Sequence, residues 1–161
     1  MAKVNVVAVP WEDDRAAALR EVLQEDIHRR YASHLQSSPN RDAALDALKV
    51  SPDDVLATVI AISDETGPVG HAALRSLNGE WEIKRVVVLK SERGKGVELL
   101  LMAEIEDIAR RGGASRVIVQ TGNAQPEALS LYLKSGYLPI PLYEPYATAI
   151  PFSHCFEKRL A

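Results

Sequence analysis

The chain has 161 residues, of which 47% are hydrophobic and 25% charged, and 19 basic against 22 acidic residues give a net charge of −3. This length suits one domain over residues 1–161, and the acidic balance argues against nucleic acid as a partner. A single cysteine excludes an internal disulfide and a cysteine-based metal cluster. His28 and His34 are six residues apart in a helical segment, the wrong spacing for a shared face, so no metal is expected. The short, interrupted apolar start and the lack of a membrane-length apolar run predict a cytoplasmic protein without a membrane partner.

The first half of the chain predicts a strand, two helices and an antiparallel meander. Aspartates at 13 and 14 can cap a helix whose apolar residues recur at helical spacing. Asn78-Gly79 is typical of a two-residue hairpin turn, because both residues tolerate positive φ. The expected elements are a strand at 3–9, a helix that starts at 13 or 14, runs through 27 and is ended by Ser38-Pro39-Asn40, a helix at 43–48, and strands at 55–62, 69–77 and 81–89.

The second half predicts a helical crossover followed by a short strand. The helix after Gly96 carries one apolar face and ends at Gly112-Gly113. A strand at 116–120 is expected to run parallel to 81–89, since a crossover of this length favours that pairing. A helix at 125–134 and two strands joined by a loop rich in proline and tyrosine complete the chain.

The stretch from Val86 to Val97 places an apolar strand, a turn with two glycines and a helix start in succession. Backbone N–H groups at a helix start lack internal partners and carry partial positive charge, so this order suits phosphate. Gly94 and Gly96 leave the backbone open to a ligand. Over residues 84–95, five cations are accompanied by a single acid, Glu92, which fits a small polyanion. A tight turn that simply needs glycine is an equally good interpretation of the stretch from Val86 to Val97 alone. The cations are Lys84, Arg85, Lys90, Arg93 and Lys95.

Two motifs in this element order resemble the GCN5-related N-acetyltransferase (GNAT) superfamily. The sequence RGKGVE at 93–98 resembles the family's Q/R-x-x-G-x-G/A signature for acyl-CoA. The sequence ALSLYLKSGY at 128–137 resembles its A-x-x-L-Y-x-x-x-G-F/Y helix end. The resemblance covers nearly the whole chain. It implies an α/β (α+β) fold with a GNAT-like mixed central sheet, splayed between the strands at 81–89 and 116–121.

The resemblance also implies an activity, namely an acetyl-CoA-dependent N-acetyltransferase that acetylates the primary amine of a small molecule by direct attack on the thioester. A protein or peptide N-acetyltransferase and a non-catalytic acyl-CoA-binding regulatory module are the alternatives, and a homodimer is expected by the same resemblance. By this likeness the backbone near the acetyl group and pantetheine comes from Val86, Val87 and Val88. The pyrophosphate would be held by the N–H groups of Arg93, Gly94, Lys95, Gly96, Val97 and Glu98, and Tyr132 would stand near the CoA sulfur.

The chain departs from the family pattern at two places. Glu98 occupies a position where the family has Gly or Ala, so its carboxylate is expected to oppose the phosphates unless it points to solvent. Gln125 stands seven residues before Tyr132, where the family often has Asn that contacts pantetheine. The nearby Asn123 could supply that contact instead.

The candidate catalytic residues are a phenol and a carboxylate. Tyr132 is expected to be the general acid, because a phenol protonated at neutral pH can donate to the leaving thiolate; an aromatic ring that only packs at a helix end is the alternative. Glu82 is the candidate base, on one strand face with Lys84, Val86 and Val88, and a surface ion pair is an equal alternative.

Four further residues are expected to bind the acceptor. Arg85, on the opposite strand face with Ile83 and Val87, could orient an acidic substrate group or join a structural ion pair. His71 is expected to line the acceptor pocket. Tyr143 and Tyr146 lie in a proline-rich segment that shapes substrate choice or forms a rigid cover over the core.

Overall fold

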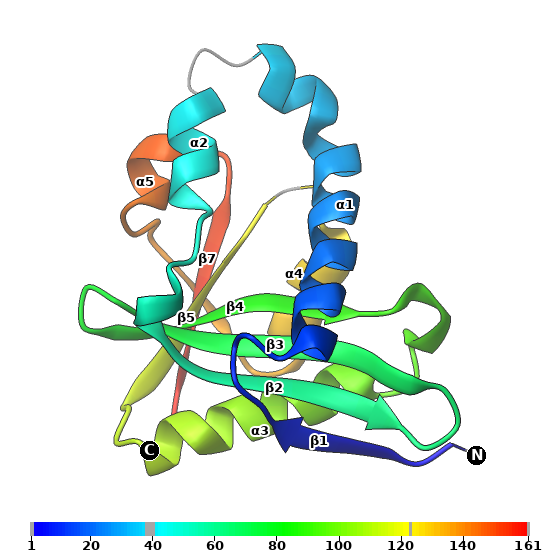
Figure 1. The fold of residues 1–161 in the computed structure, drawn as a ribbon. Coiled ribbons are helices and arrows are strands. Elements are labelled where there is room, and N and C mark those ends of the chain that lie inside the picture. Colours follow the sequence, from blue (N-terminus) through cyan, green and yellow to red (C-terminus); the bar gives the residue numbers. More distant parts are fainter. Residues whose placement is uncertain (1, 38–40, 123, 161) are drawn as a thin grey trace.

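The computed structural model describes residues 2–37, 41–122 and 124–160, and its seven strands form one sheet (Figure 1). The strand order is β1-β2-β3-β4-β5-β7-β6, and within these ranges only the β4–β5 pair is parallel. The strands are β1 (Val4–Ala8), β2 (Val55–Ser63), β3 (Gly67–Leu77), β4 (Glu80–Val88), β5 (Arg116–Thr121), β6 (Leu138–Ile140) and β7 (His154–Arg159). The helices are α1 (Asp14–Ser37), α2 (Arg41–Ala47), α3 (Val97–Arg111), α4 (Pro126–Lys134) and α5 (Tyr146–Ala149).

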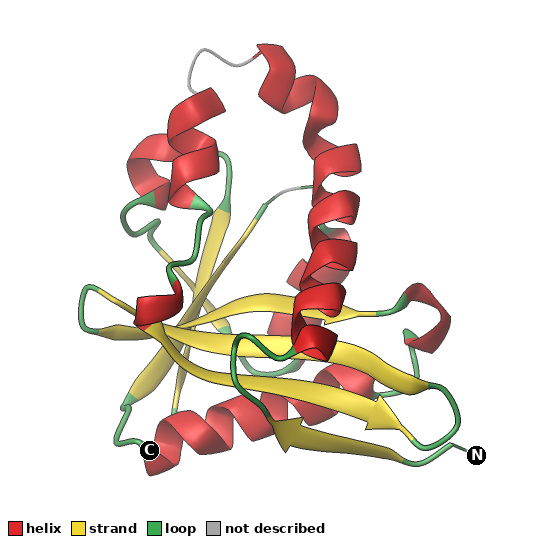
Figure 2. Cartoon of the chain, in the orientation of Figure 1, coloured by secondary structure: helices red, strands yellow, loops and turns green. Residues whose placement is uncertain are grey.

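Helices cover both faces of the sheet, because the central strands are apolar on both sides (Figure 2). On one face, Leu101 and Ile105 of α3 pack with Leu74 and Ile83 of the strands. On the other face, the first turns of α1 form a smaller cluster with Ile60 and Val87. The central strands are therefore packed between α1 on one face and α3 on the other. In the part of the chain described above, no helix is both long and apolar enough to cross a bilayer.

The element order and the parallel β4–β5 pair confirm the expected fold. Asn78 and Gly79 have φ values of 51° and 81°, as a two-residue hairpin with positive φ requires. Helix α1 ends at Ser37, just before the segment 38–40 that was expected to end it. Two details differ from the sequence expectations. Strand β4 stops at Val88 before a 3₁₀ turn at Lys90–Glu92, and the loop rich in proline and tyrosine contains the short helix α5.

Candidate active site

Strands β4 and β5 pair over only two residue positions and then separate. Glu82 pairs with Ile118 and Ile83 with Val119, while β5 goes on pairing with β7 as far as Thr121. Figure 1 shows β5 and β7 turning away from the direction of β4. Beyond Ile83, the edge of β4 that faces β5 has no partner strand. A cavity of about 640 Å³ opens there, which is within the range of small-molecule sites.

The glycine turn forms one end of this cavity. Gly94 and Gly96 have left-handed φ values of 78° and 86°, and no atom lies within 4 Å of the position that a Cβ would take at either residue. The first helical bond of α3 runs from the Leu100 N–H to the Gly96 carbonyl. The N–H groups of Val97 and Glu98 therefore lack helical partners, and the end of α3 can bind an anion.

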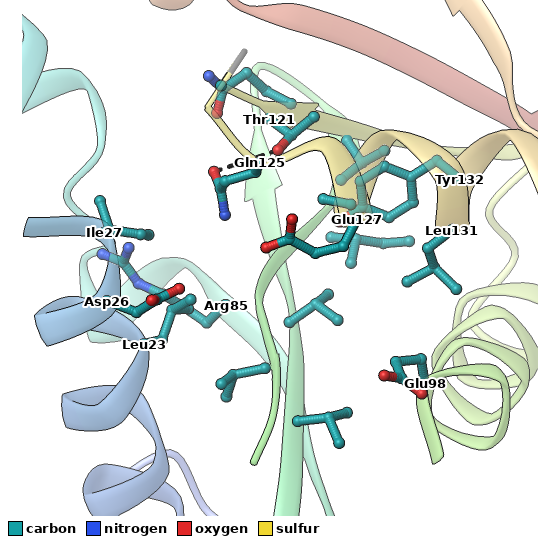
Figure 3. A pocket seen from close by; sticks show the side chains of 18 of the residues that line it. Leu23, Asp26, Ile27, Arg85, Glu98, Thr121, Gln125, Glu127, Leu131 and Tyr132 are labelled. Atoms are coloured by element: carbon teal, nitrogen blue, oxygen red, sulfur yellow. Dashed lines mark hydrogen bonds between the residues drawn. The ribbon is translucent and has the colours of Figure 1, made fainter. Parts of the chain in front are cut away.

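The charged side chains of the turn point to three different surroundings. Arg93 Nε donates to the Val88 carbonyl at 3.0 Å, which ties the turn to the end of β4. Lys95 is exposed and pairs with Glu92 at 3.3 Å. Glu98 lines the cavity, as Figure 3 shows, so its carboxylate faces the side where an anion would bind.

Tyr132 lies in the wall of the cavity on α4 (Figure 3) and is only 4% exposed. Its ring packs against Tyr137 and Phe156 with centroid distances of 5.7 and 5.9 Å. Burial raises the pKa of the phenol, and the negative charge of Glu82 raises it further. The hydroxyl is therefore protonated at neutral pH and can donate a proton into the cavity.

Glu82 is fully buried and does not line the cavity. One carboxylate oxygen accepts from Arg75 Nε, the cross-strand neighbour, and the other accepts from the Tyr143 hydroxyl, both at 2.7 Å. A carboxylate with both oxygens bonded inside the protein is not placed to take a proton from an acceptor amine. This geometry does not favour Glu82 as the general base, a role that stays a prediction, and the ion pair that Glu82 forms with Arg75 is buried rather than at the surface.

A β-bulge in β4 changes which residues share a face. Ala73 pairs with Lys84 but His71 pairs with Val87, so one extra residue of β4 is inserted at Arg85, whose φ is 58°. An extra residue inverts the alternation of all side chains after it. Val86 and Val88 consequently pack toward α3, with Ile83, while Val87 packs toward α1. The expected common face of Glu82, Lys84, Val86 and Val88 is therefore wrong, as is that of Arg85 with Ile83 and Val87.

His71 is fully buried and stabilises this bulge instead of lining the acceptor pocket. Its Nδ1–H donates to the Arg85 carbonyl at 2.7 Å, and its Nε2 accepts from Arg20 at 3.0 Å. A carbonyl only accepts and a guanidinium only donates, so these partners select the neutral imidazole. Burial, together with the charges of Arg20 and Arg85, lowers the pKa of His71 to about 4.

Tyr143 and Tyr146 also lie away from the cavity. The Tyr146 hydroxyl is buried and accepts from Arg75 and Lys84, each at 2.9 Å, while Tyr143 donates to Glu82. Their segment is thus closer to the rigid cover than to a direct substrate contact. The residues after this segment that line the cavity are Ile150 and Phe152, which the sequence did not indicate.

The acceptor side of the cavity is built largely from other residues that the sequence analysis missed. Leu23, Asp26 and Ile27 of α1 lie there with Arg85 in Figure 3, and Leu48 follows α2. Lys84 also lines the cavity, and burial lowers its pKa to about 8. The helical spacing of Leu23 and Ile27 indicated a buried helix face but not which wall that face would form.

The remaining predicted contacts lie at the β5 end of the cavity. Gln125 lines it and accepts from the Thr121 hydroxyl at 3.4 Å (Figure 3). Asn123 lies outside the described residues.

A splayed parallel strand pair, a glycine-rich helix start and a buried phenol in one cavity define an acyl-CoA-dependent transferase. Residues 17–137 match the sequence model of the Acetyltransferase (GNAT) family. This chain belongs to the GNAT acetyltransferase family.

The chain is also similar to individual relatives. It is 31% identical to an IAA acetyltransferase of Azospirillum brasilense over 163 aligned residues, which cover 99% of this chain and 100% of the relative. It is 40% identical over 78 residues to the uncharacterized N-acetyltransferase YjcF of Bacillus subtilis, and this match spans about half of each chain, 48% and 54%. A structure from Klebsiella pneumoniae, provisionally described as an acyl-CoA N-acyltransferase, superimposes with a TM-score of 0.77 at 25% identity over 98% of both chains.

Proposed function

We propose that this chain is an acetyl-CoA-dependent N-acetyltransferase that acetylates the primary amine of a small molecule, with residues 1–161 as one catalytic domain. The observation that carries the proposal is the gap between β4 and β5, with an anion-binding helix start at one end and a protonated phenol in its wall. The homodimer and the cytoplasmic location stay predictions.

The residues around the gap fit acetyl-CoA, which supplies the activated acetyl thioester. The N–H groups of residues 94–98 hold the pyrophosphate, since that of Arg93 already donates to the Lys90 carbonyl at 3.4 Å. The left-handed glycines let the backbone approach the pyrophosphate closely. The free edge of β4 at Val86–Val88 pairs with the amides of the pantetheine arm. Nearer the start of β4, the same edge pairs with β5. Glu98 opposes the phosphates and weakens binding.

The chain's own groups perform the transfer in three ways. Backbone N–H groups at the opening of β4 donate to the oxygen that becomes negative when the amine attacks, a role that is often worth a few kcal/mol. Tyr132 donates its proton to the thiolate that leaves, the attacking nitrogen releases one proton to water in the cavity, and the Tyr132 phenolate regains a proton from water, so the reaction as a whole neither gains nor loses a proton. The cations Lys84 and Arg85 lower the pKa of a bound ammonium group, which increases the fraction of neutral, attacking amine.

A small-molecule acceptor is favoured because side chains from α1, from Leu48 and from Ile150 and Phe152 wall the acceptor side. Thermal shifts with CoA and acetyl-CoA, followed by a thiol-release assay over a panel of amines, test the proposal. We expect stabilisation by both ligands and turnover on at least one small amine. Stabilisation without turnover on any amine would favour a binding module, and turnover on peptides alone would favour a protein acetyltransferase. No stabilisation would contradict every one of these functions.

A further inference from the structure

Arg85 carries a charge that no carboxylate side chain of the described residues neutralises. Its guanidinium lines the cavity, and its hydrogen bond within the protein runs from Nη2 to the Leu48 carbonyl at 2.9 Å. All 22 Asp and Glu side chains lie in the described ranges, and none comes within 4 Å of this guanidinium. A largely buried cation without a carboxylate partner is unusual in proteins, because burial without a counter-charge is unfavourable.

The charges around Arg85 do not compensate for it. Arg20, Arg75 and Lys84 act on it or lie beside it as further cations. Glu82 is the nearby acid, and its two oxygens are already bonded to Arg75 and Tyr143. The acceptor end of the cavity therefore has an excess of positive charge, which attracts an anionic group of a ligand.

The backbone fixes the place of this charge. Arg85 is the inserted residue of the β4 bulge, and its carbonyl is held by buried His71 at 2.7 Å. The side chain leaves the strand where β4 and β5 have just separated, next to the β4 edge that we assign to the thioester. An acceptor that binds Arg85 is thus kept beside the reacting carbonyl.

The other side chains at this end are mainly apolar. Leu23 and Ile27 line this end of the cavity together with Arg85 (Figure 3), and Leu48, Ile150 and Phe152 line it as well. The acid on this side, Asp26, is engaged by Arg30 at 3.0 Å and by Arg29 at 3.5 Å. Among the described residues, the wall thus offers an apolar surface beside the Arg85 guanidinium, while the second cation there, Lys84, donates to the Tyr146 hydroxyl.

We propose that the acceptor is an amino acid with an apolar side chain, whose carboxylate pairs with Arg85 and whose α-amine is acetylated. The planar fork of a guanidinium matches a carboxylate, and the apolar wall receives the side chain. The inference rests on the proposed N-acetyltransferase function and names the substrate class of that site.

Matched acceptors test the inference, namely L-phenylalanine against L-phenylalaninamide and L-leucine against L-leucinamide. Each pair shares its amine and side chain and differs in the carboxylate. We expect kcat/KM to be about tenfold or more higher for the acid, mainly through KM, as for a charge-assisted hydrogen bond. The amide amine is the less basic of the two and hence more often neutral, so a higher rate for the acid cannot come from amine basicity.

Two variants localise the effect. Arg85→Gln should reduce the acid-to-amide ratio to near one, whereas Arg111→Gln removes an exposed charge of α3 that lies outside the cavity and should leave that ratio unchanged. Calorimetry of N-acetylphenylalanine and of its amide, with CoA present, measures the preference for the carboxylate without turnover. The CoA-induced thermal shift verifies that each variant is folded.

The outcomes separate the two proposals. Amides used as well as acids, or a preference that survives in Arg85→Gln, would overturn the amino-acid inference and leave N-acetyl transfer intact. Turnover of other amines but of neither pair would overturn it as well. Absence of any CoA-induced shift together with absence of turnover would instead refute the proposed function.

Discussion

Acid should destabilise this protein through His71, the buried imidazole that holds the β4 bulge. Lowering the pH from 7 to 4.5 is the perturbation. The His71 imidazole donates to the Arg85 carbonyl and accepts from Arg20, so it has no place for a second proton. Protonation would set an imidazolium against the Arg20 guanidinium inside the protein.

The magnitude follows from the pKa of His71, which is 6.5 as an ordinary value and about 4 in the folded protein. Because the folded pKa is lower, the unfolded chain binds more protons between these values, and stability falls as the pH falls through this window. The full contribution of neutral His71 to the unfolding free energy is present above pH 6.5. At 1.36 kcal/mol per pH unit, roughly 2.5 kcal/mol of unfolding free energy is lost by pH 4.5.

Urea unfolding of the wild type and of His71→Gln at pH 7 and pH 4.5 measures this contribution. Carboxylates also lose stabilisation in acid, so the informative quantity is the difference between the two proteins in their loss of unfolding free energy. We expect the wild type to lose about 2.5 kcal/mol more than the variant. His154→Gln, which removes an exposed histidine, is the control and should behave as the wild type. Equal losses in the wild type and in His71→Gln would refute the reasoning.

Three further predictions concern the cavity and its support. Tyr132→Phe should lower kcat roughly 100-fold with little change in CoA affinity by calorimetry; an unchanged kcat would remove its role as the acid. Glu98→Gln should tighten CoA binding by about threefold, because a like charge near the phosphates is removed and helix propensity is kept; weaker binding would show that the carboxylate points elsewhere. Glu82→Gln should lower the unfolding free energy by about 3 kcal/mol in urea, since Arg75 keeps a buried charge without its partner; a loss well below 1 kcal/mol would contradict the buried pair.

Local sequence patterns determined most of the fold of this protein. Asn78-Gly79 specifies a hairpin because few residue pairs accept positive φ at both positions. The glycine turn before Val97 and the apolar face of the following helix indicate a crossover, and hence the parallel pairing of β4 and β5. These features depend on residues close together in the chain, so the sequence alone carries them. The Tyr132 motif likewise identified the residue that the structure places in the cavity wall.

Tertiary structure alone decided which polar side chains reach the cavity. Strict alternation along β4 put Glu82 on the same face as Val86, and no local signal revealed the residue inserted at Arg85 that inverts the faces after it. The partners that bury Glu82 come from another strand and a distant loop, Arg75 and Tyr143. Such neighbours decide whether a carboxylate can act as a base or is one half of an ion pair, because an oxygen that already accepts a hydrogen bond inside the protein cannot take a proton from a substrate. Only folding brings these distant neighbours next to Glu82.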